Sequence, residues 1–132
     1  MATMTIIMFG DYPMRFINMD NEYYIIARDL GPVFDEADTT LACENIRAVN
    51  KVKVGLKMSD RVAEYTLLNL KGAKQYCRTK VNYRKHHKNR SAALVEWLTK
   101  QFTGVAFFGK NFKLNVAYTS HTKDELHISR KK

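Results

Sequence analysis

The residues with the clearest chemical potential lie in one basic run, residues 78–90, which contains no Asp or Glu. Lysine and arginine side chains neutralise phosphates, and adjacent imidazoles are candidate metal ligands or catalytic groups. The run therefore predicts a surface that attracts a polyanion. Its candidate DNA-binding residues are Arg78, Lys80, Asn82, Tyr83, Arg84, Lys85, His86, His87, Lys88 and Arg90.

Different residues of this run suit different contacts with DNA. We expect the Lys and Arg side chains to bind phosphates, with Arg84 or Asn82 reaching base edges and Tyr83 available to stack. A second group of basic residues, close together in sequence, could extend the patch: Arg47, Lys51 and Lys53. The alternative is a basic loop that is only solvated, which is common for charge runs.

An enzymatic role has less support. His86, His87 and Asn89 are residue types of a His-based nuclease, and His121 or His127 could join them. However, no acidic residue lies at a credible metal-ligand spacing from them, and the common phosphate-binding and hydrolase motifs are missing from the sequence. The sequence therefore predicts a protein that is not an enzyme and that needs no metal or cofactor.

Composition sets the broad class. The chain has 132 residues, 45% of them hydrophobic, which predicts one folded domain. Its net charge of +9 and pI near 9.6 favour an anionic partner, nucleic acid before membrane. Cys43 and Cys77 form no metal-type pair and are expected to be buried free thiols. No signal peptide and no apolar run of about 20 residues is recognised, so we expect a cytoplasmic protein.

Helical spacing of apolar residues flanks the basic run. We predict one helix over residues 70–78, capped by Asn69, and another over 92–102, capped by Ser91. Gly72 either weakens the first helix or marks a close packing contact. Trp97 lies one position off the apolar stripe of the second and should widen its buried face. The two helices would present the basic run as a loop between them.

The rest of the chain predicts an α+β fold. Strands are expected over 4–9, 14–19 and 23–27 as a small antiparallel sheet, with a turn at Asp20-Asn21, and a β-ribbon over 51–54 and 64–69. Between them we expect a short helical turn at 29–34, an acidic loop at 35–38, and a helix over 41–49 that buries Leu41, Ile46 and Val49. Residues 105–108 read as a strand or a buried irregular segment, and 112–118 alternate again. We assign residues 1–119 to one domain and 120–132 to a polar, basic tail.

Three short segments, taken in order, resemble a known family. The run from Tyr23 to Leu30 resembles the aromatic-hydrophobic-Ala-x-Asp-hydrophobic signature of the Bro-N domain, found in baculovirus repeated-ORF proteins and phage antirepressors. Residues 69–76 match the position of that family's glycine-containing helix start, and 93–98 resemble its A-x-x-F-x-x-W helix with a compressed spacing. The resemblance implies an α+β domain that binds double-stranded DNA in a phage or viral regulator.

A second class of function is direct capture of a repressor or other host protein. In that hypothesis the acidic loop at 35–38 binds the basic DNA-reading surface of the repressor. The alternative is that the loop only balances charge locally. A homodimer is a further hypothesis, because many regulators are symmetric dimers, although no residue pattern specifies one.

Overall fold

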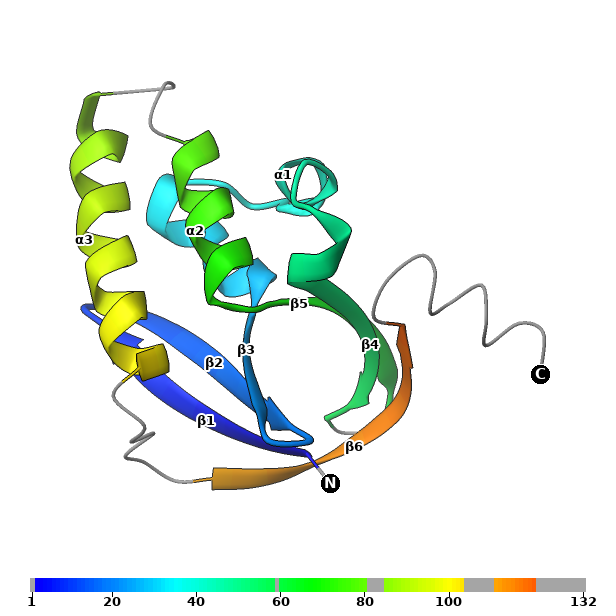
Figure 1. Cartoon of the computed structure of the whole chain (residues 1–132). Helices are drawn as coiled ribbons and strands as arrows, with labels where there is room; N and C mark the ends of the chain where they lie inside the picture. Colours follow the sequence, from blue (N-terminus) through cyan, green and yellow to red (C-terminus); the bar gives the residue numbers. More distant parts are fainter. Residues whose placement is uncertain (1, 59, 81–84, 104–110, 121–132) are drawn as a thin grey trace.

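The computed structural model describes residues 2–58, 60–80, 85–103 and 111–120 and has the predicted α+β class. Six antiparallel strands form a closed barrel in the order β1-β2-β3-β5-β4-β6, with β6 pairing with both β4 and β1 (Figure 1). The predicted sheet and ribbon are thus parts of a single barrel. The strands are β1 (Ala2–Phe9), β2 (Tyr12–Met19), β3 (Glu22–Ile26), β4 (Lys51–Lys57), β5 (Val62–Leu68) and β6 (Asn111–Ser120).

Tight turns fix the register of the first three strands. The β1–β2 turn has Gly10 at φ 59°, and the β2–β3 turn has Asp20 and Asn21 at φ 54° and 66°. Two consecutive residues with positive φ are typical of the hairpin turns whose twist matches that of the strands. The predicted Asp20-Asn21 turn is confirmed, and β1 pairs with β2 from Ala2↔Met19 to Phe9↔Tyr12.

Neighbouring residues on the strands belong to two separate apolar cores. Ile17 and Leu67 point into the barrel, whereas Phe16 and Leu68 point outward beneath the helices. Successive side chains of a strand lie on opposite faces, so a strand covered on both sides is apolar throughout. Trp97 packs over the outer core, as predicted. Its ring centroid lies 5.2 Å from that of Phe9 and 5.8 Å from that of Phe16.

The helices cover one side of the barrel, and α2 and α3 lie side by side and antiparallel (Figure 1). No helix of the described part is long and apolar enough to cross a membrane. The helical segments are η1 (Ala27–Asp29), η2 (Gly31–Phe34), α1 (Thr40–Glu44), η3 (Ala48–Asn50), α2 (Leu70–Thr79) and α3 (Lys85–Thr103).

Two helix predictions were wrong. Helix α3 begins at Lys85, so half of the predicted basic loop is helical, and Ser91 is no N-cap. Ser91 is instead buried inside α3 and donates a hydrogen bond to the Cys77 carbonyl at 3.1 Å. The predicted helix over 41–49 is replaced by the short α1 and η3, which leave Leu41 and Val49 exposed while Ile46 is buried. Residues 105–108 and 121–132 lie outside the described residues.

Gly72 marks a close contact between α2 and the chain before β4. A Cβ atom built on Gly72 would overlap the carbonyl oxygen of Asn50 and press on Leu68. Asn50 is itself held from two sides, since its side chain donates to Gln75 at 3.0 Å and accepts from Asn69 at 3.3 Å. Glycine is therefore required at position 72 by packing, which resolves the alternative left open by the sequence.

We predict that Gly72→Ala destabilises the protein by about 2 kcal/mol, because overlap with backbone outweighs a helix-propensity gain of about 1 kcal/mol. Urea denaturation would measure it. Lys71→Ala, at an exposed neighbouring position, should stay within about 0.5 kcal/mol of the parent protein. A Gly72→Ala variant as stable as the parent would contradict the proposed contact.

Both cysteines are buried free thiols, as predicted. Burial raises the pKa of the Cys77 thiol from 9.0 to about 12. The unfolded chain therefore loses this proton at lower pH than the folded protein does. Below pH 9 both states keep it and the thiol contributes no pH dependence, whereas above pH 9 the folded state becomes progressively less stable.

We predict that Cys77→Ala flattens the fall in stability between pH 9 and 12 by up to about 1.4 kcal/mol per pH unit. Urea denaturation across that pH range would measure the slope. The variant will also lose stability at pH 7 through its smaller side chain, so the slope and not the absolute stability is the test. An unchanged slope would show that Cys77 is not shielded from solvent in the folded state.

Candidate nucleic-acid interface

The outward face of α2 is basic. Asn69 caps the helix, accepting a hydrogen bond from the Gly72 amide at 2.8 Å, as predicted. Ala73, Tyr76 and Cys77 then point into the core. The helical repeat therefore places a row of cations on the opposite face: Lys71, Lys74 and Arg78. Lys71 and Arg78 are exposed and Lys74 is half-buried.

The surroundings of this row in the chain are also basic. Residues 65–95 contain eight Lys or Arg and no Asp or Glu. Among the described residues no acidic side chain forms an ion pair with Lys71, Lys74 or Arg78. The row therefore keeps its positive charge available to an external anion. Lys71 and Lys74 were not among the residues predicted to bind DNA, although their spacing from Arg78 on a predicted helix was a signal that could have found them.

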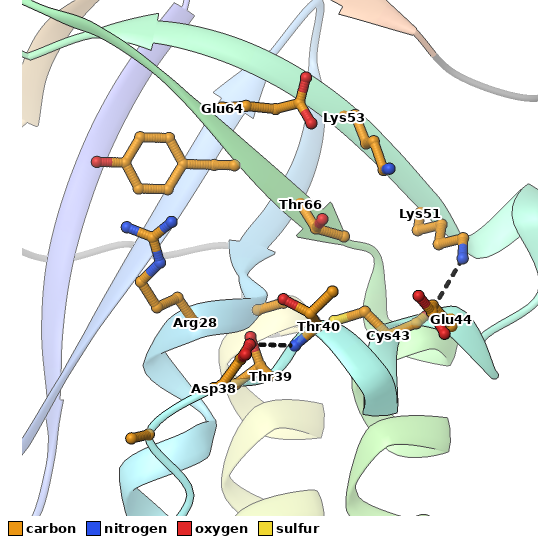
Figure 2. Close-up of a pocket in the computed structure, with 13 residues that line it drawn as sticks. Arg28, Asp38, Thr39, Thr40, Cys43, Glu44, Lys51, Lys53, Glu64 and Thr66 are labelled. Carbon is orange, nitrogen blue, oxygen red and sulfur yellow. Dashed lines mark hydrogen bonds between the residues drawn. The ribbon is translucent and has the colours of Figure 1, made fainter.

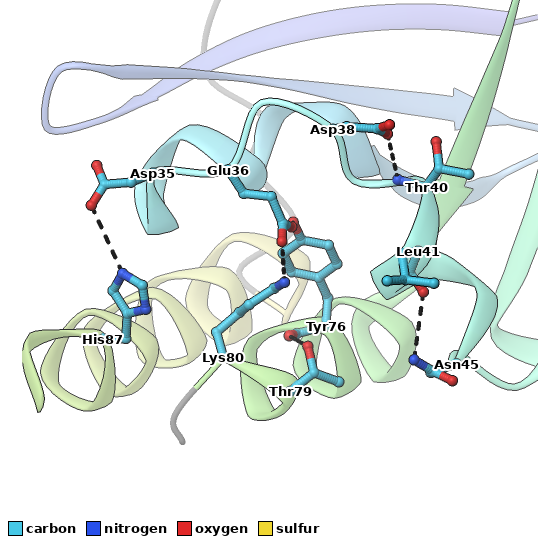
Figure 3. Close-up of polar contacts among 10 residues, drawn as sticks. All are labelled: Asp35, Glu36, Asp38, Thr40, Leu41, Asn45, Tyr76, Thr79, Lys80 and His87. Atoms are coloured by element: carbon cyan, nitrogen blue, oxygen red, sulfur yellow. Dashed lines mark hydrogen bonds and ion pairs between the residues drawn. The ribbon is translucent and has the colours of Figure 1, made fainter. Parts of the chain in front are cut away.

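The predicted basic run divides into outward and inward residues. Arg78 ends the outward row of α2, and Lys88 is exposed on the first part of α3. Lys80 is different, because it is only 6% exposed and its ammonium pairs with Glu36 and lies 5.4 Å from the Tyr76 ring centroid (Figure 3). Its predicted contact with phosphate is not supported by this geometry, since the ammonium already has a counter-ion.

His87 and Arg90 also point inward, toward η2. His87 is buried with its ring against Phe34, and its Nε2 lies 3.8 Å from a carboxylate oxygen of Asp35 (Figure 3). Arg90 donates to the Val33 carbonyl at 2.9 Å and to Asp35 at 3.3 Å. These two side chains hold α3 against η2. His87 is buried and thus poorly placed to contact DNA, whereas the Arg90 side chain is 39% exposed and its contact with DNA stays a prediction.

For five of the residues predicted to bind DNA, the structure does not describe the side chain. Asn82, Tyr83 and Arg84 lie outside the described residues, so their predicted base contacts and stacking stay predictions. Lys85 and His86 form the start of α3, which fixes their backbone as helical. The junction between α2 and α3 thus remains a predicted part of the interface.

The other three predicted cations do not belong to the helical pair. Arg47 is exposed before η3. Lys51 donates to the Cys43 carbonyl at 2.8 Å, and Lys53 lies exposed two residues along β4 (Figure 2). Lys51 and Lys53 line a pocket of about 290 Å³ together with Arg28 and three acidic residues, so this pocket carries mixed charge. The acidic residues are Asp38, Glu44 and Glu64.

The acidic segment 35–38 is engaged within the protein. The Glu36 carboxylate accepts from both the Tyr76 hydroxyl and the Lys80 ammonium (Figure 3). Asp35 contacts His87 and Arg90, and Asp38 accepts from the Thr40 amide at 2.9 Å. Hydrogen bonding to the Thr40 side chain, and then to its amide, lowers the pKa of the Asp38 carboxyl. Burial, and then the hydrogen bond to Glu36, raise the pKa of Tyr76 and keep its phenol protonated. The segment therefore joins η2 and α1 to the two long helices.

The arrangement of α2 and α3 differs from that of a helix-turn-helix reader. In that motif the two helices cross at about 90–120°, and the second enters the major groove. Here they run antiparallel beside one another (Figure 1). Along one face of α3 the side chains of His87, Ser91, Leu94 and Leu98 are buried. The available surface is thus the outer side of a helical pair, which suits contacts to the phosphate backbone.

Comparison with known proteins provides no relative from which the role of this surface could be inferred. No family model, no curated protein and no solved structure matches the chain. The segment from Tyr23 to Leu30 has a structural role here: Ala27 and Leu30 are buried, and Asp29 receives the Arg15 amide at 2.8 Å and its guanidinium at 2.7 Å. This contact raises the pKa of Arg15 and ties the end of β3 to β2.

Metal chemistry gains no support from the described side chains. Within that part of the chain no group of three His, Cys, Asp or Glu residues is placed to hold a metal ion. His87, one of the two imidazoles considered for a nuclease, is buried against Phe34.

We predict that Glu36→Gln destabilises the protein by about 3 kcal/mol, because it leaves the Lys80 ammonium buried without a counter-ion. This value is at the low end of the usual range because the Glu36 side chain is 27% exposed. Thermal and urea unfolding would measure the loss. Glu96→Gln is the matched control: its side chain is 72% exposed and pairs only with Lys100 among the described residues, so the change should be below about 0.5 kcal/mol. Equal losses of stability in the two variants would contradict the role of Glu36 as the counter-ion of the buried Lys80 ammonium.

Proposed function

We propose that this protein binds double-stranded DNA through the outer surface of α2 and the first part of α3. The observation that carries the proposal is the row Lys71, Lys74 and Arg78, which points outward and has no acidic partner among the described residues. Lys88 extends the row onto α3. Such a surface binds phosphates by releasing counterions and does not by itself read sequence.

Geometry favours positioning on the DNA backbone. Successive outward residues of a helix stand about 5–6 Å apart, so one row can follow successive phosphates without entering a groove. Any reading of base edges would come from residues at the junction of α2 and α3, where Asn82 and Arg84 remain the predicted candidates. The role as a phage or viral transcription regulator rests on the resemblance to the Bro-N domain and is part of the same proposal.

Capture of a repressor through the acidic segment is the weaker alternative. Asp35, Glu36 and Asp38 all have contacts within the protein, and Glu36 would have to leave the buried Lys80 to bind a partner. Breaking such a pair costs several kcal/mol, which a new contact would have to offset. The reading in which this segment balances charge locally agrees better with its contacts.

Charge reversal of the α2 row provides the test. Lys71→Glu with Arg78→Glu should abolish binding to a random-sequence duplex, whereas Arg61→Glu with Lys100→Glu should leave most of it. All four residues are exposed, and both pairs change the net charge equally. Fluorescence anisotropy at low salt would measure the affinities. Equal losses in the two variants would show that only the net charge matters.

The salt dependence gives a second readout. Each phosphate contact contributes about −0.9 to the log-log slope of affinity against salt, so four contacts predict a slope of about −4. Replacing Lys74 with Ala should reduce the magnitude of that slope by about one. A duplex affinity that does not change with salt would refute the phosphate-binding proposal.

A further inference from the structure

The outer face of strands β4, β5 and β6 carries an exposed aromatic residue. Tyr118 on β6 is 47% exposed, and its hydroxyl donates to a carboxylate oxygen of Glu64 on β5 at 2.9 Å. This hydrogen bond raises the pKa of the Tyr118 phenol above its ordinary value. Because β4 lies between β5 and β6, the side chain spans the width of a strand.

The Tyr118 ring lies flat on β4 at Gly55, its register partner. A Cβ atom built on Gly55 would fall closest to ring atom Cε2, with the two neighbouring ring atoms next, Cδ2 at 2.6 Å and Cζ at 2.7 Å. An approach to the ring edge would leave those neighbours much farther away than Cε2. One face of the ring therefore covers the Gly55 backbone, and the other face points away from the sheet.

Two lysines flank this ring on the same face of β4. Residues two apart on a strand share a face, so Lys53 and Lys57 lie on either side of Gly55. Both are exposed, and neither forms an ion pair within the described residues. At about 3.3 Å per residue their backbones stand roughly 13 Å apart, with the ring between them.

The same surface continues into the pocket of about 290 Å³ that Lys53 and Glu64 help to line (Figure 2). On the other side of that pocket the Arg28 guanidinium lies 4.7 Å from the Tyr65 ring centroid. Arg28 is exposed, and its planar group offers a second surface on which a flat ring could stack. Tyr118, Lys53 and Arg28 thus follow one another along one path, which also carries the carboxylates of Asp38, Glu44 and Glu64.

We propose that this face, formed by Tyr118, Lys53 and Lys57 and continuing to Arg28, binds single-stranded nucleic acid. An exposed ring held flat provides a stacking surface for one unpaired base, and the flanking lysines provide charge for the neighbouring phosphates. A duplex would not fit this role, because its bases are already stacked on each other. The proposal concerns a different face from α2 and does not depend on duplex binding there.

The main test compares oligo(dT) of 12 nucleotides with an abasic strand of the same length, by fluorescence anisotropy with the full chain. Stacking on one ring predicts that Tyr118→Ala weakens oligo(dT) binding by about 5- to 150-fold, and that Tyr118→Phe stays close to the parent protein. The abasic strand should bind as weakly to the parent as oligo(dT) binds to Tyr118→Ala. Oligo(rU) in parallel shows whether the face prefers RNA or DNA.

A second variant keeps the test decisive if Tyr118→Ala disturbs the barrel, which circular dichroism would reveal. Lys53→Gln with Lys57→Gln leaves the ring in place and should reduce the magnitude of the salt slope for oligo(dT) by about 1.4. The variant Lys71→Glu with Arg78→Glu, which should lose duplex binding, should retain its affinity for oligo(dT) within about threefold. Loss in this variant alone would assign single strands to α2 and overturn the proposal.

Two further results would overturn it. One is equal affinity of the parent protein and folded Tyr118→Ala for oligo(dT). The other is displacement of oligo(dT) by an equal concentration of duplex of the same length, because a duplex offers phosphates but no free bases. Failure of duplex binding alone would count against the α2 proposal and leave the sheet-face proposal standing.

Discussion

The constraint on which the structure depends is the burial of both faces of the strands beneath the helices. Closing six strands into a barrel encloses one core, and packing the helices on the outside creates a second. Adjacent residues such as Phe16 and Ile17, or Leu67 and Leu68, are consequently buried on opposite sides. Because most large apolar side chains are buried in these two cores, most charged residues lie on the outer faces of the helices and strands.

The long helices are fixed to the barrel by polar contacts as well as by apolar packing. Glu36 joins Tyr76 and Lys80 at the end of α2, while Asp35 joins His87 and Arg90 at the start of α3. These contacts place Asp35 and Glu36, which follow η2, against polar or basic side chains of the helical pair. These contacts pair Lys80 and Arg90 with acidic residues, whereas the outward row on α2 has no acidic partner among the described residues.

The two proposed surfaces suit different forms of nucleic acid for physical reasons. A row of helical cations offers charge without an aromatic face, which suits the regularly spaced phosphates of a duplex. The sheet face offers a ring pressed flat on Gly55 between two lysines, which suits an unpaired base and its phosphates. One surface lies on helix α2 and the other on strands β4 and β6.

Local sequence signals determined much of this protein. The alternation of strand residues, the Asn69 cap, the Asp20-Asn21 turn and the burial of both cysteines were all predictable because each depends on neighbouring residues or on composition. The basic character of residues 78–90 was equally evident. Only the tertiary structure decided which of those cations face outward, since Lys80 and Arg90 are paired with acids 44 and 55 residues away in the chain. The same holds for Tyr118, whose place over Gly55 follows from barrel closure between strands distant in sequence, and a one-dimensional pattern carries no information about which distant strands pair.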